Sequence, residues 1–312
     1  MLAGVSALLL VAGCGAAPTA PSLAGLSFAA PASALPVQVT DSTGTATTVE
    51  STERILAVNG DLVEVVFALG LGGSLVARDL SATYPPQVQE LPVVGYQRAL
   101  SPEPIAAFEP TLVLANSLAG PPGAVEQLRR VAPTVVLHYP ETLDGPPAKI
   151  RAVARVLGVP GRGEELARTV EQEIAAATAI AAGSVERPRV AVLYVRGEGV
   201  QVLLGRGTAE LVEAAGGVDV ARELGITDSA AVDPETLIAA APDVLVVTTS
   251  GLESVGGVDG LLELAGGAFA RTPAGERRRV LAFEDQYLLG FGPRTGALLT
   301  ELARALHPEE SS

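Results

Sequence analysis

The chain has 312 residues, of which 48% are hydrophobic, and its formal net charge is −14 at pH 7. This length leaves room for two domains of ordinary size. A surface with so many carboxylates repels phosphate backbones, so we expect no nucleic-acid partner. The single cysteine, Cys14, excludes an internal disulfide.

Residues 1–14 predict a lipoprotein signal peptide. The apolar run LAGVSALLLVAG (2–13) has the length of a signal-peptide core and is too short for a stable transmembrane helix. Small residues before Cys14 resemble a bacterial lipobox, in which the cysteine is lipidated and becomes the mature N-terminus. Residues 15–52 are rich in Ala, Pro, Ser and Thr, so we expect a flexible tether. The alternative is a buried cysteine in an ordinary leader.

Residues 53–160 predict a first lobe in which apolar strands alternate with helices. Strands are expected at 53–60, 73–80, 91–96, 110–115 and 133–139, and helices at 61–71, 121–132 and 145–159. Asp61 is the expected cap of the first helix. The alternation predicts βα units and a mainly parallel sheet, because strands that are buried on both faces are continuous apolar runs.

Residues 161–184 predict one long linking helix, and residues 185–312 predict a second lobe. In that lobe, strands are expected at 187–195, 242–249 and 278–284, and helices at 208–217, 234–241, 260–268 and 294–306. The predicted fold is therefore α/β, with two Rossmann-like lobes joined by one rigid helix. Each lobe is a mainly parallel sheet flanked by helices.

An internal repeat relates the two lobes. LSPEPIAAFEPTLVLANS (100–117) aligns with VDPETLIAAAPDVLVVTTS (232–250), so that Glu103 matches Glu235. Proline suits a first helical turn and an acid there complements the helix dipole, so helix-start chemistry alone explains both glutamates. The alternative is that two matching lobes each expose one glutamate and together form a two-point docking surface.

Residues 53–307 resemble the substrate-binding proteins of bacterial ABC importers that have a single linking helix, a family that serves iron-siderophores, cobalamin and haem. GYQRALSPE (95–103) resembles the Gly-Tyr-x-Arg-x-Leu-Ser-x-Glu segment of haem-binding members. LLGFGPRT (288–295) resembles their C-terminal signature, and LLGRGTAELVEAAGG (203–217) resembles their Gly-Arg-Gly-Thr helix entry.

The resemblance implies that Tyr96 is the haem-iron ligand. Ferric iron is a hard cation, and tyrosinate is one of the known proximal haem ligands. A neighbouring cation favours an ionised phenol, so Arg98 would supply charge and a hydrogen bond to the phenolate. His138 is a possible second ligand. The alternatives are that Tyr96 is a wall residue, that Arg98 is a surface charge and that His138 packs or hydrogen-bonds at the rim of the cleft.

Three further side chains are candidate haem contacts in the second lobe. Arg294 and Arg206 are possible partners of the haem propionates, although Arg294 could instead stabilise the last helix and Arg206 could be a loop charge. Tyr287 could stack on the ligand. The stretch ITDSAAVDPE (226–235) has no aromatic residue where many haem-binding relatives carry one, which puts a ligand contribution from this loop in doubt.

We expect a binding protein rather than an enzyme, because the sequence has no nucleophile elbow, no His/Cys metal cluster and no P-loop. By resemblance, it is an extracytoplasmic monomer, anchored to the membrane only through lipidated Cys14, that delivers haem to an ABC permease homodimer with its ATPase. Glu103 and Glu235 would then dock the two permease subunits. One alternative is a ferric siderophore or cobalamin as cargo, and the other is a cytoplasmic enzyme of the chelatase or nitrogenase-like type.

Overall fold

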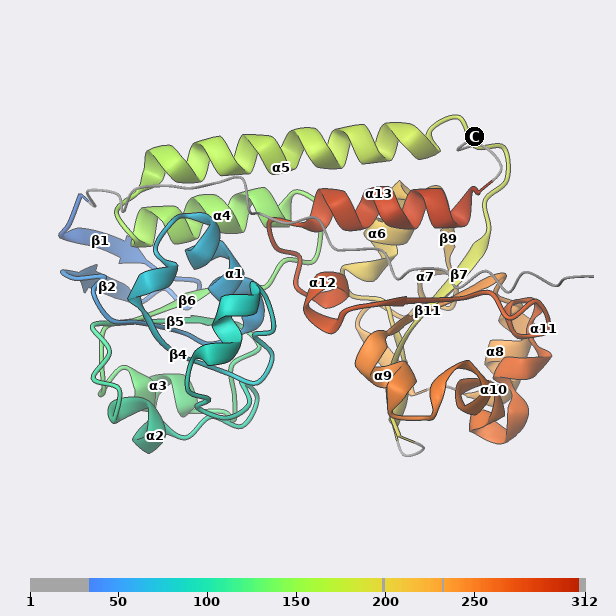
Figure 1. The fold of residues 1–312 in the computed structure, drawn as a ribbon, viewed down its shortest axis with the longest axis horizontal. Coiled ribbons are helices and arrows are strands. Elements are labelled where there is room, and N and C mark those ends of the chain that lie inside the picture. Colours follow the sequence, from blue (N-terminus) through green and yellow to red (C-terminus); the bar gives the residue numbers. More distant parts are fainter. Residues whose placement is uncertain (1–33, 198–199, 232, 309–312) are drawn as a thin grey trace, which may run out of the picture.

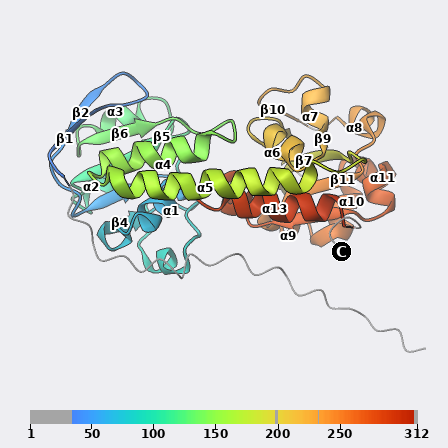
Figure 2. The same ribbon diagram turned by 90° about the horizontal axis from the view of Figure 1, so that it is seen from above.

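The computed structural model describes residues 34–197, 200–231 and 233–308. It has two α/β lobes side by side, with the 22-residue helix α5 (Pro160–Ala181) running along both of them (Figures 1 and 2). The predicted fold class is thus confirmed. Cys14, the candidate lipidation site, lies outside the described residues.

The N-terminal lobe is built on a four-stranded parallel sheet in the order β4-β3-β5-β6. Its strands are β3 (Ile55–Ala57), β4 (Leu75–Arg78), β5 (Leu112–Asn116) and β6 (Thr134–Leu137). The helices of this lobe are α1 (Gly60–Ala68), α2 (Pro102–Ala106), α3 (Ala124–Leu128) and α4 (Gly145–Val156). Strands β3, β5 and β6 are buried along their whole length, as the continuous apolar runs predict.

The N-terminal end of the described chain is folded, which differs from the expected tether over residues 15–52. Strands β1 (Val37–Thr40) and β2 (Ala46–Val49) form an antiparallel hairpin. Asp41 holds the hairpin against the lobe, because its carboxylate accepts hydrogen bonds from Arg129 at 2.6 Å and from the Val136 amide at 3.2 Å. The short alternation of valine with polar residues outweighs the tether-like composition here.

Two local predictions in the N-terminal lobe are wrong. Residues 91–96 form no strand, and only one isolated bridge joins Val93 to Arg78. Asp61 does not cap α1, whose N-cap position is Asn59. Asp61 instead lies buried in the first turn, where its carboxylate forms an ion pair with Lys149 at 2.7 Å.

The C-terminal lobe has a six-stranded mixed sheet in the order β10-β8-β7-β11-β12, with β9 beside β7. Its strands are β7 (Arg189–Arg196), β8 (Val200–Leu204), β9 (Val218–Asp219), β10 (Ser229–Ala231), β11 (Val244–Thr248) and β12 (Val280–Phe283). Strands β7, β9, β11 and β12 are parallel, whereas β8 and β10 add an antiparallel edge. We did not predict β8, β9 or β10.

Helices cover both faces of this second sheet. They are α6 (Thr208–Ala214), α7 (Val220–Glu223), α8 (Pro234–Ala240), α9 (Thr249–Glu253), α10 (Gly257–Gly267), α11 (Pro273–Glu276), α12 (Asp285–Leu289) and α13 (Thr295–Leu306). Short 3-10 helices lie at Gly72–Ser74, Pro86–Glu90 and Phe269–Arg271. No helix in the described ranges is both long enough and apolar enough to span a bilayer.

Helix α5 contributes to the hydrophobic cores of both lobes. Leu166 and Val170 belong to the N-terminal core, whereas Ala177 belongs to the C-terminal core. Two glycines permit its close packing against neighbours. A Cβ on Gly163 would lie 2.2 Å from Cβ of Ala154 in α4, and a Cβ on Gly296 of α13 would lie 2.4 Å from Cβ of Glu173.

Candidate ligand-binding residues at the junction of the lobes

The chain after the carboxyl end of β3 in the N-terminal sheet meets the chain after the edge strand β12 of the C-terminal sheet at the junction between the lobes. Gln286, at the start of α12 after β12, donates from Nε2 to the Gly60 carbonyl at 2.9 Å, directly after β3. Thr83 Oγ1 donates to Glu284 Oε1 at 2.6 Å across the same junction. In open α/β sheets the carboxyl ends of the strands are the usual location of ligand sites.

A buried ion pair occupies the core of this junction. Arg294 donates from Nε and Nη2 to the two carboxylate oxygens of Glu64, each at 2.9 Å. Its guanidinium also lies 3.7 Å from the ring centroid of Tyr84 and 4.8 Å from that of Tyr287. Only 5% of Arg294 is exposed, so the structure commits this residue to joining the lobes and not to an open binding surface.

Tyr287 is likewise part of the packed interior. It is 7% exposed, it contacts Phe283 edge to face, and its hydroxyl donates to Glu301 Oε1 at 3.1 Å. Burial, followed by the charge of Glu301, raises the pKa of Tyr287 well above its ordinary range. The structure therefore does not offer this ring for stacking on a ligand.

Tyr96 and Arg98 lie on an exposed loop between β4 and α2. The loop is fixed at its start by a hydrogen bond from the Leu80 amide to the Gly95 carbonyl at 2.8 Å, and it turns through a bond from the Ala99 amide to the Tyr96 carbonyl. Tyr96 is 39% exposed. Arg98 is also exposed, and within the described residues its guanidinium forms no hydrogen bond or ion pair. Both side chains are therefore available to a ligand.

A second Tyr-x-Arg pair lies in the C-terminal lobe and was missed in the sequence. Tyr194 and Arg196 are at the carboxyl end of β7, with the Arg196 guanidinium 4.9 Å from the Tyr194 ring centroid. Arg196 donates to Ser250 Oγ at 2.5 Å and to Asp285 Oδ1 at 2.8 Å. The spacing repeats that of Tyr96 and Arg98, but the surrounding apolar run RVAVLYVR (189–196) reads only as a strand.

Arg206 forms an exposed ion-pair bridge between the lobes. Its guanidinium lies 2.7 Å from Glu141 of the N-terminal lobe and 2.9 Å from Asp228 of its own lobe. Its side chain is 38% exposed, so solvent and a ligand carboxylate can both reach it. The sequence-based choice of Arg206 as a candidate anion partner is thus compatible with its position, in contrast to Arg294.

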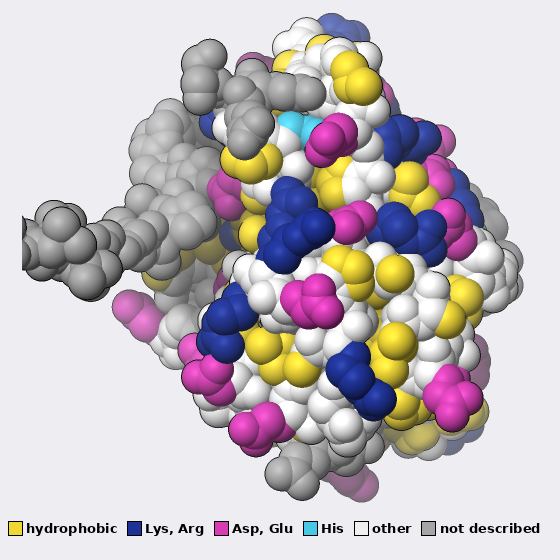
Figure 3. Space-filling view, turned by 90° about the vertical axis from the view of Figure 1, so that its right-hand side faces the viewer, with side chains coloured by type: hydrophobic (Ala, Val, Ile, Leu, Met, Phe, Trp, Pro, Cys, Tyr) yellow, Lys and Arg dark blue, Asp and Glu magenta, His cyan; other side chains and the backbone are white. Residues whose placement is uncertain are grey.

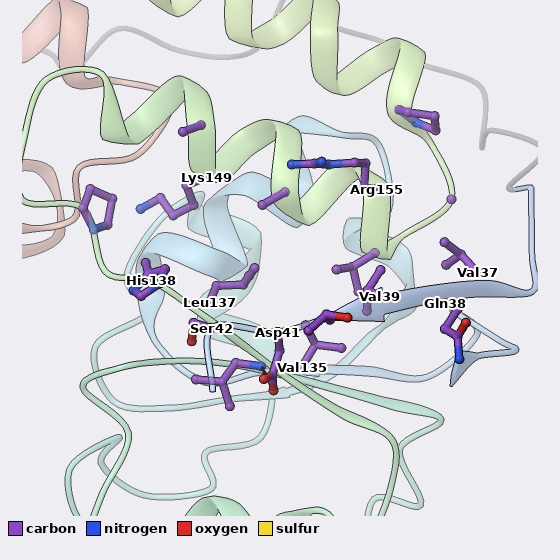
Figure 4. A pocket seen from close by; sticks show the side chains of 18 of the residues that line it. Val37, Gln38, Val39, Asp41, Ser42, Val135, Leu137, His138, Lys149 and Arg155 are labelled. Carbon is purple, nitrogen blue, oxygen red and sulfur yellow. Dashed lines mark hydrogen bonds between the residues drawn. The ribbon is translucent and has the colours of Figure 1, made fainter. Parts of the chain in front are cut away.

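His138 lines a cavity of about 690 Å³ between the β1 strand, β6 and α4 (Figure 4). In this view, His138 and Lys149 lie toward one end of the cavity, and the Arg155 side chain projects from α4 toward the other end. Neither Tyr96 nor Arg98 is among the residues that line it. The assignment of His138 as a second iron ligand stays a prediction.

Tyr139 follows His138 and contacts the other lobe. Its hydroxyl donates to the Leu289 carbonyl in α12. Burial raises the pKa of Tyr139 far above its ordinary range, and the Asp61 carboxylate adds to this effect, whereas Arg98 and Arg206 oppose it. This phenol keeps its proton, and we do not count it among the candidate anionic ligands.

The two candidate docking glutamates are both exposed. Glu103 lies in the first turn of α2, where its carboxylate accepts a hydrogen bond from Ser101 Oγ at 2.9 Å. Glu235 lies in the first turn of α8, which Asp233 caps by accepting from the Thr236 amide at 2.8 Å. One glutamate therefore stands on each lobe, as the sequence repeat predicts.

Charges of both signs are interspersed on the outer end of the C-terminal lobe (Figure 3). The ion pairs of this lobe include Arg222 with Glu213 at 2.5 Å and Arg278 with Asp259 at 2.7 Å. The arginines of these two pairs are neutralised by their carboxylate partners, and no continuous basic surface is visible on the face that Figure 3 shows. Such a surface lacks the electrostatic footprint of a nucleic-acid binder.

Comparison with known proteins gives one family and several similar structures. Residues 55–287 match the family model described as "Periplasmic binding protein". The periplasmic haem-binding protein RhuT from Roseiflexus sp. RS-1, in its apo form, is 48% identical with a TM-score of 0.80, over 83% of this chain and 100% of that chain. The haem-binding protein HmuT is 36% identical with a TM-score of 0.83, over 88% and 91% of the two chains.

A curated relative binds a different tetrapyrrole. The vitamin B12-binding protein of Pectobacterium carotovorum subsp. carotovorum (strain PC1) is 30% identical over 122 residues, which are 39% of this chain. The match spans 44% of that protein, less than half of its length. RhuT and HmuT therefore share more of this chain than this relative does, and at higher identity.

Proposed function

Because the chain belongs to the periplasmic binding protein family, we propose that it binds haem outside the cytoplasm and delivers it to an ABC-type permease. The observation that carries this proposal is the exposed Tyr96 with Arg98 two residues away, on a loop at the carboxyl end of the N-terminal sheet. The similarity to RhuT and HmuT along most of the chain supports haem as the cargo. Proteins of this kind bind and release their ligand, and the proposal involves no catalytic step.

In this proposal haem lies between the lobes and Tyr96 binds its iron. A phenolate is a hard anionic donor that suits ferric iron, and the Arg98 guanidinium favours the anionic form of the ring oxygen. Arg206 is the proposed partner of a haem carboxylate, which would replace Glu141 or Asp228 on its guanidinium. Tyr194, with Arg196 beside it, is the alternative iron donor in the C-terminal lobe.

Delivery requires contacts outside the ligand site. Glu103 and Glu235 are proposed to pair with basic side chains of the two permease subunits, because each is exposed at the start of a helix on its own lobe. We also propose that lipidation of Cys14 holds the protein at the outer face of the cell membrane. A monomer suffices for this arrangement, since each chain carries both glutamates.

Cobalamin is the second candidate cargo, because the relative from Pectobacterium is a vitamin B12-binding protein. Both ligands are large tetrapyrroles, but only ferric haem calls for an anionic oxygen donor such as Tyr96. A ferric siderophore is less well supported, since an anionic siderophore needs several free cations. Arg294 is buried and Arg196 is paired with Asp285, and Arg206 must exchange one carboxylate partner for each anionic group that it takes.

Titration of the purified protein with haemin, followed by visible absorbance, tests the proposal. We expect saturable binding with the spectrum of a tyrosinate-ligated ferric haem, and loss or replacement of that spectrum in Tyr96→Phe. Tyr194→Phe is the matched variant on the other lobe, and an unchanged spectrum is expected there. No saturable change in the parent protein would refute haem as cargo, and a parallel cobalamin titration would then decide for the alternative. Loss of the spectrum in Tyr194→Phe alone would identify Tyr194 of the C-terminal lobe as the residue that binds the iron.

A further inference from the structure

Large apolar side chains are exposed beside Tyr96. Six large hydrophobic residues are exposed in the described parts of the chain, and three of them are Leu80 at 56%, Val93 at 44% and Tyr96 at 39%. The other three lie elsewhere in the chain, at 180, 185 and 224. Scattered exposed apolar residues need no explanation, but a group of them commonly marks a binding surface.

The three side chains come from two segments that lie side by side. The Arg78 amide donates to the Pro92 carbonyl at 2.9 Å, and the Val94 amide donates to the Arg78 carbonyl at 2.9 Å. The Leu80 amide then donates to the Gly95 carbonyl at 2.8 Å. Leu80 therefore lies next to the residue that precedes Tyr96. We name Leu80 and Val93 the apolar platform.

The platform lies close to the other lobe. Three residues after Leu80, Thr83 donates its hydroxyl proton to Glu284 of the C-terminal lobe. The chain between β4 and α2 thus runs along the side of the N-terminal lobe that faces its partner lobe (Figure 1). A ligand held between the lobes by Tyr96 would cover Leu80 and Val93 and remove their apolar surface from water.

Chemistry restricts what can cover this surface. The occupant must present an apolar face to the platform. When no iron holds Tyr96 as a phenolate, Arg98 can receive an anionic group of the occupant, because its guanidinium is exposed and has no ion-pair partner among the described residues. A dicarboxylate porphyrin meets both requirements through its ring and its propionates, and neither requirement involves the metal.

We propose that the apolar platform binds the porphyrin ring independently of iron, so that the protein also takes up iron-free porphyrins at the same place. This inference rests on the proposed function and extends it to a second ligand class. Tyr96 then has two separable roles. Its oxygen binds iron when iron is present, and its ring continues the platform in either case.

The test compares haemin with iron-free protoporphyrin IX, whose own fluorescence reports binding. We expect the parent protein to bind protoporphyrin IX saturably and haemin to displace it. Leu80 and Val93 are about half exposed, so covering either side chain contributes only part of the free energy of a full side-chain burial. Leu80→Ser and Val93→Ser should therefore each lower the affinity for both ligands about fivefold. Tyr96→Phe should weaken haemin alone, because phenylalanine keeps the ring and loses the oxygen.

Leu224→Ser is the matched control, since Leu224 is 39% exposed in the C-terminal lobe and has no place in the proposal. It should leave both affinities unchanged. Binding of haemin without binding of protoporphyrin IX would overturn the inference and leave the proposed function intact. Parent-like affinity for protoporphyrin IX in both Leu80→Ser and Val93→Ser would also overturn it. Failure of the parent protein to bind haemin would instead refute the proposed function.

Discussion

Glu64 and Arg294 form a bidentate ion pair across the lobe junction, and their side chains are only 2% and 5% exposed. Removing one partner of such a pair leaves the other charge buried without compensation. We therefore expect Glu64→Ala to lower the free energy of unfolding by about 3–5 kcal/mol. Urea denaturation, followed by circular dichroism, measures this change.

The matched control is Glu213→Ala, which removes the partner of Arg222 from a pair whose side chains are 35% and 52% exposed. Solvent screens this pair, so the expected loss is within about 1 kcal/mol. Equal losses in the two variants would mean that the Glu64 pair does not hold the junction.

Asp219 gives a second prediction at the residue scale. The carboxyl is 1% exposed, one oxygen accepts the Arg222 amide at 2.7 Å, and the other has no hydrogen-bond partner among the described residues. Burial raises the pKa of Asp219 to about 6. A raised pKa in the folded state means that folding favours the protonated acid, so this group lowers stability as pH rises from about 4 to about 6.

Asp219→Asn should remove that pH dependence while keeping an oxygen for the Arg222 amide. The free energy of unfolding of the variant, minus that of the parent protein, should therefore increase from pH 4 to pH 6. Above pH 6 this difference should stay constant. Thermal unfolding at several pH values gives this difference directly. A difference that does not change with pH would show that Asp219 keeps an ordinary pKa in the folded protein.

The sequence predicts which single residues can bind a ligand better than it predicts which side chains those residues contact in the folded protein. Tyr96 and Arg98 are predicted from one short segment, and the structure finds both exposed. Arg294 is chosen from an equally specific segment and Tyr287 from the position directly before it. Arg294 nevertheless pairs with Glu64, which is distant in sequence, and Tyr287 donates to Glu301 of the following helix. A short sequence motif cannot predict a contact partner that lies outside the motif. Tyr194 and Arg196 are missed for the converse reason, because their strand reads as core.

At the scale of elements, Glu103 and Glu235 occupy the same place in repeated strand–helix units. We expect the double variant Glu103→Lys/Glu235→Lys to abolish haem uptake by cells while leaving haemin affinity unchanged, because both carboxylates are exposed in the first turns of their helices and neither is a proposed ligand contact. Uptake by a strain that lacks the native protein, together with a haemin titration, separates the two effects.

Helix-start chemistry is the competing explanation, since an acid in a first turn stabilises its helix by about 0.3–1 kcal/mol. Glu126→Lys/Asp259→Lys is the matched control, because these acids lie in the first turns of α3 and α10, one in each lobe. Normal uptake in the docking variant, or equal loss in the control, would count against docking by Glu103 and Glu235.

Elements buried on both faces are predicted well, and elements at the margins are not. The runs that became β5, β6 and β11 are continuously apolar and buried along their length. Residues 91–96 have a similar composition but pair with β4 through one bridge only. The hairpin of β1 and β2 depends on Arg129 and Val136 for its anchorage, so its own composition says little about it.

At the scale of the whole molecule, the lobes are joined by more than α5. Lys149 donates from one amine to Asp61 at 2.7 Å and to the Gly290 carbonyl of the other lobe at 2.9 Å. Together with Glu64, Arg294 and Gln286, this amine fixes the junction by buried polar contacts. We therefore expect the relative motion of the lobes to be a small rocking.

Small-angle X-ray scattering of the free and haem-loaded protein tests this restriction. We expect the radius of gyration to be the same in both states within the error of the measurement. A clear compaction on loading would show that the lobes close like a hinge and that the junction contacts break or slide. The Glu64→Ala protein is the useful comparison, because any motion that the ion pair suppresses should become visible there.

Helix α5 has a consequence for how the chain folds. Its first half completes the core of one lobe and its second half completes the core of the other, and Ile174 packs against both. Both interiors therefore include side chains from the same helix. During synthesis, the first half of α5 can pack on the N-terminal lobe as soon as it is made, whereas its second half gains its core only when the later strands β7 to β12 follow.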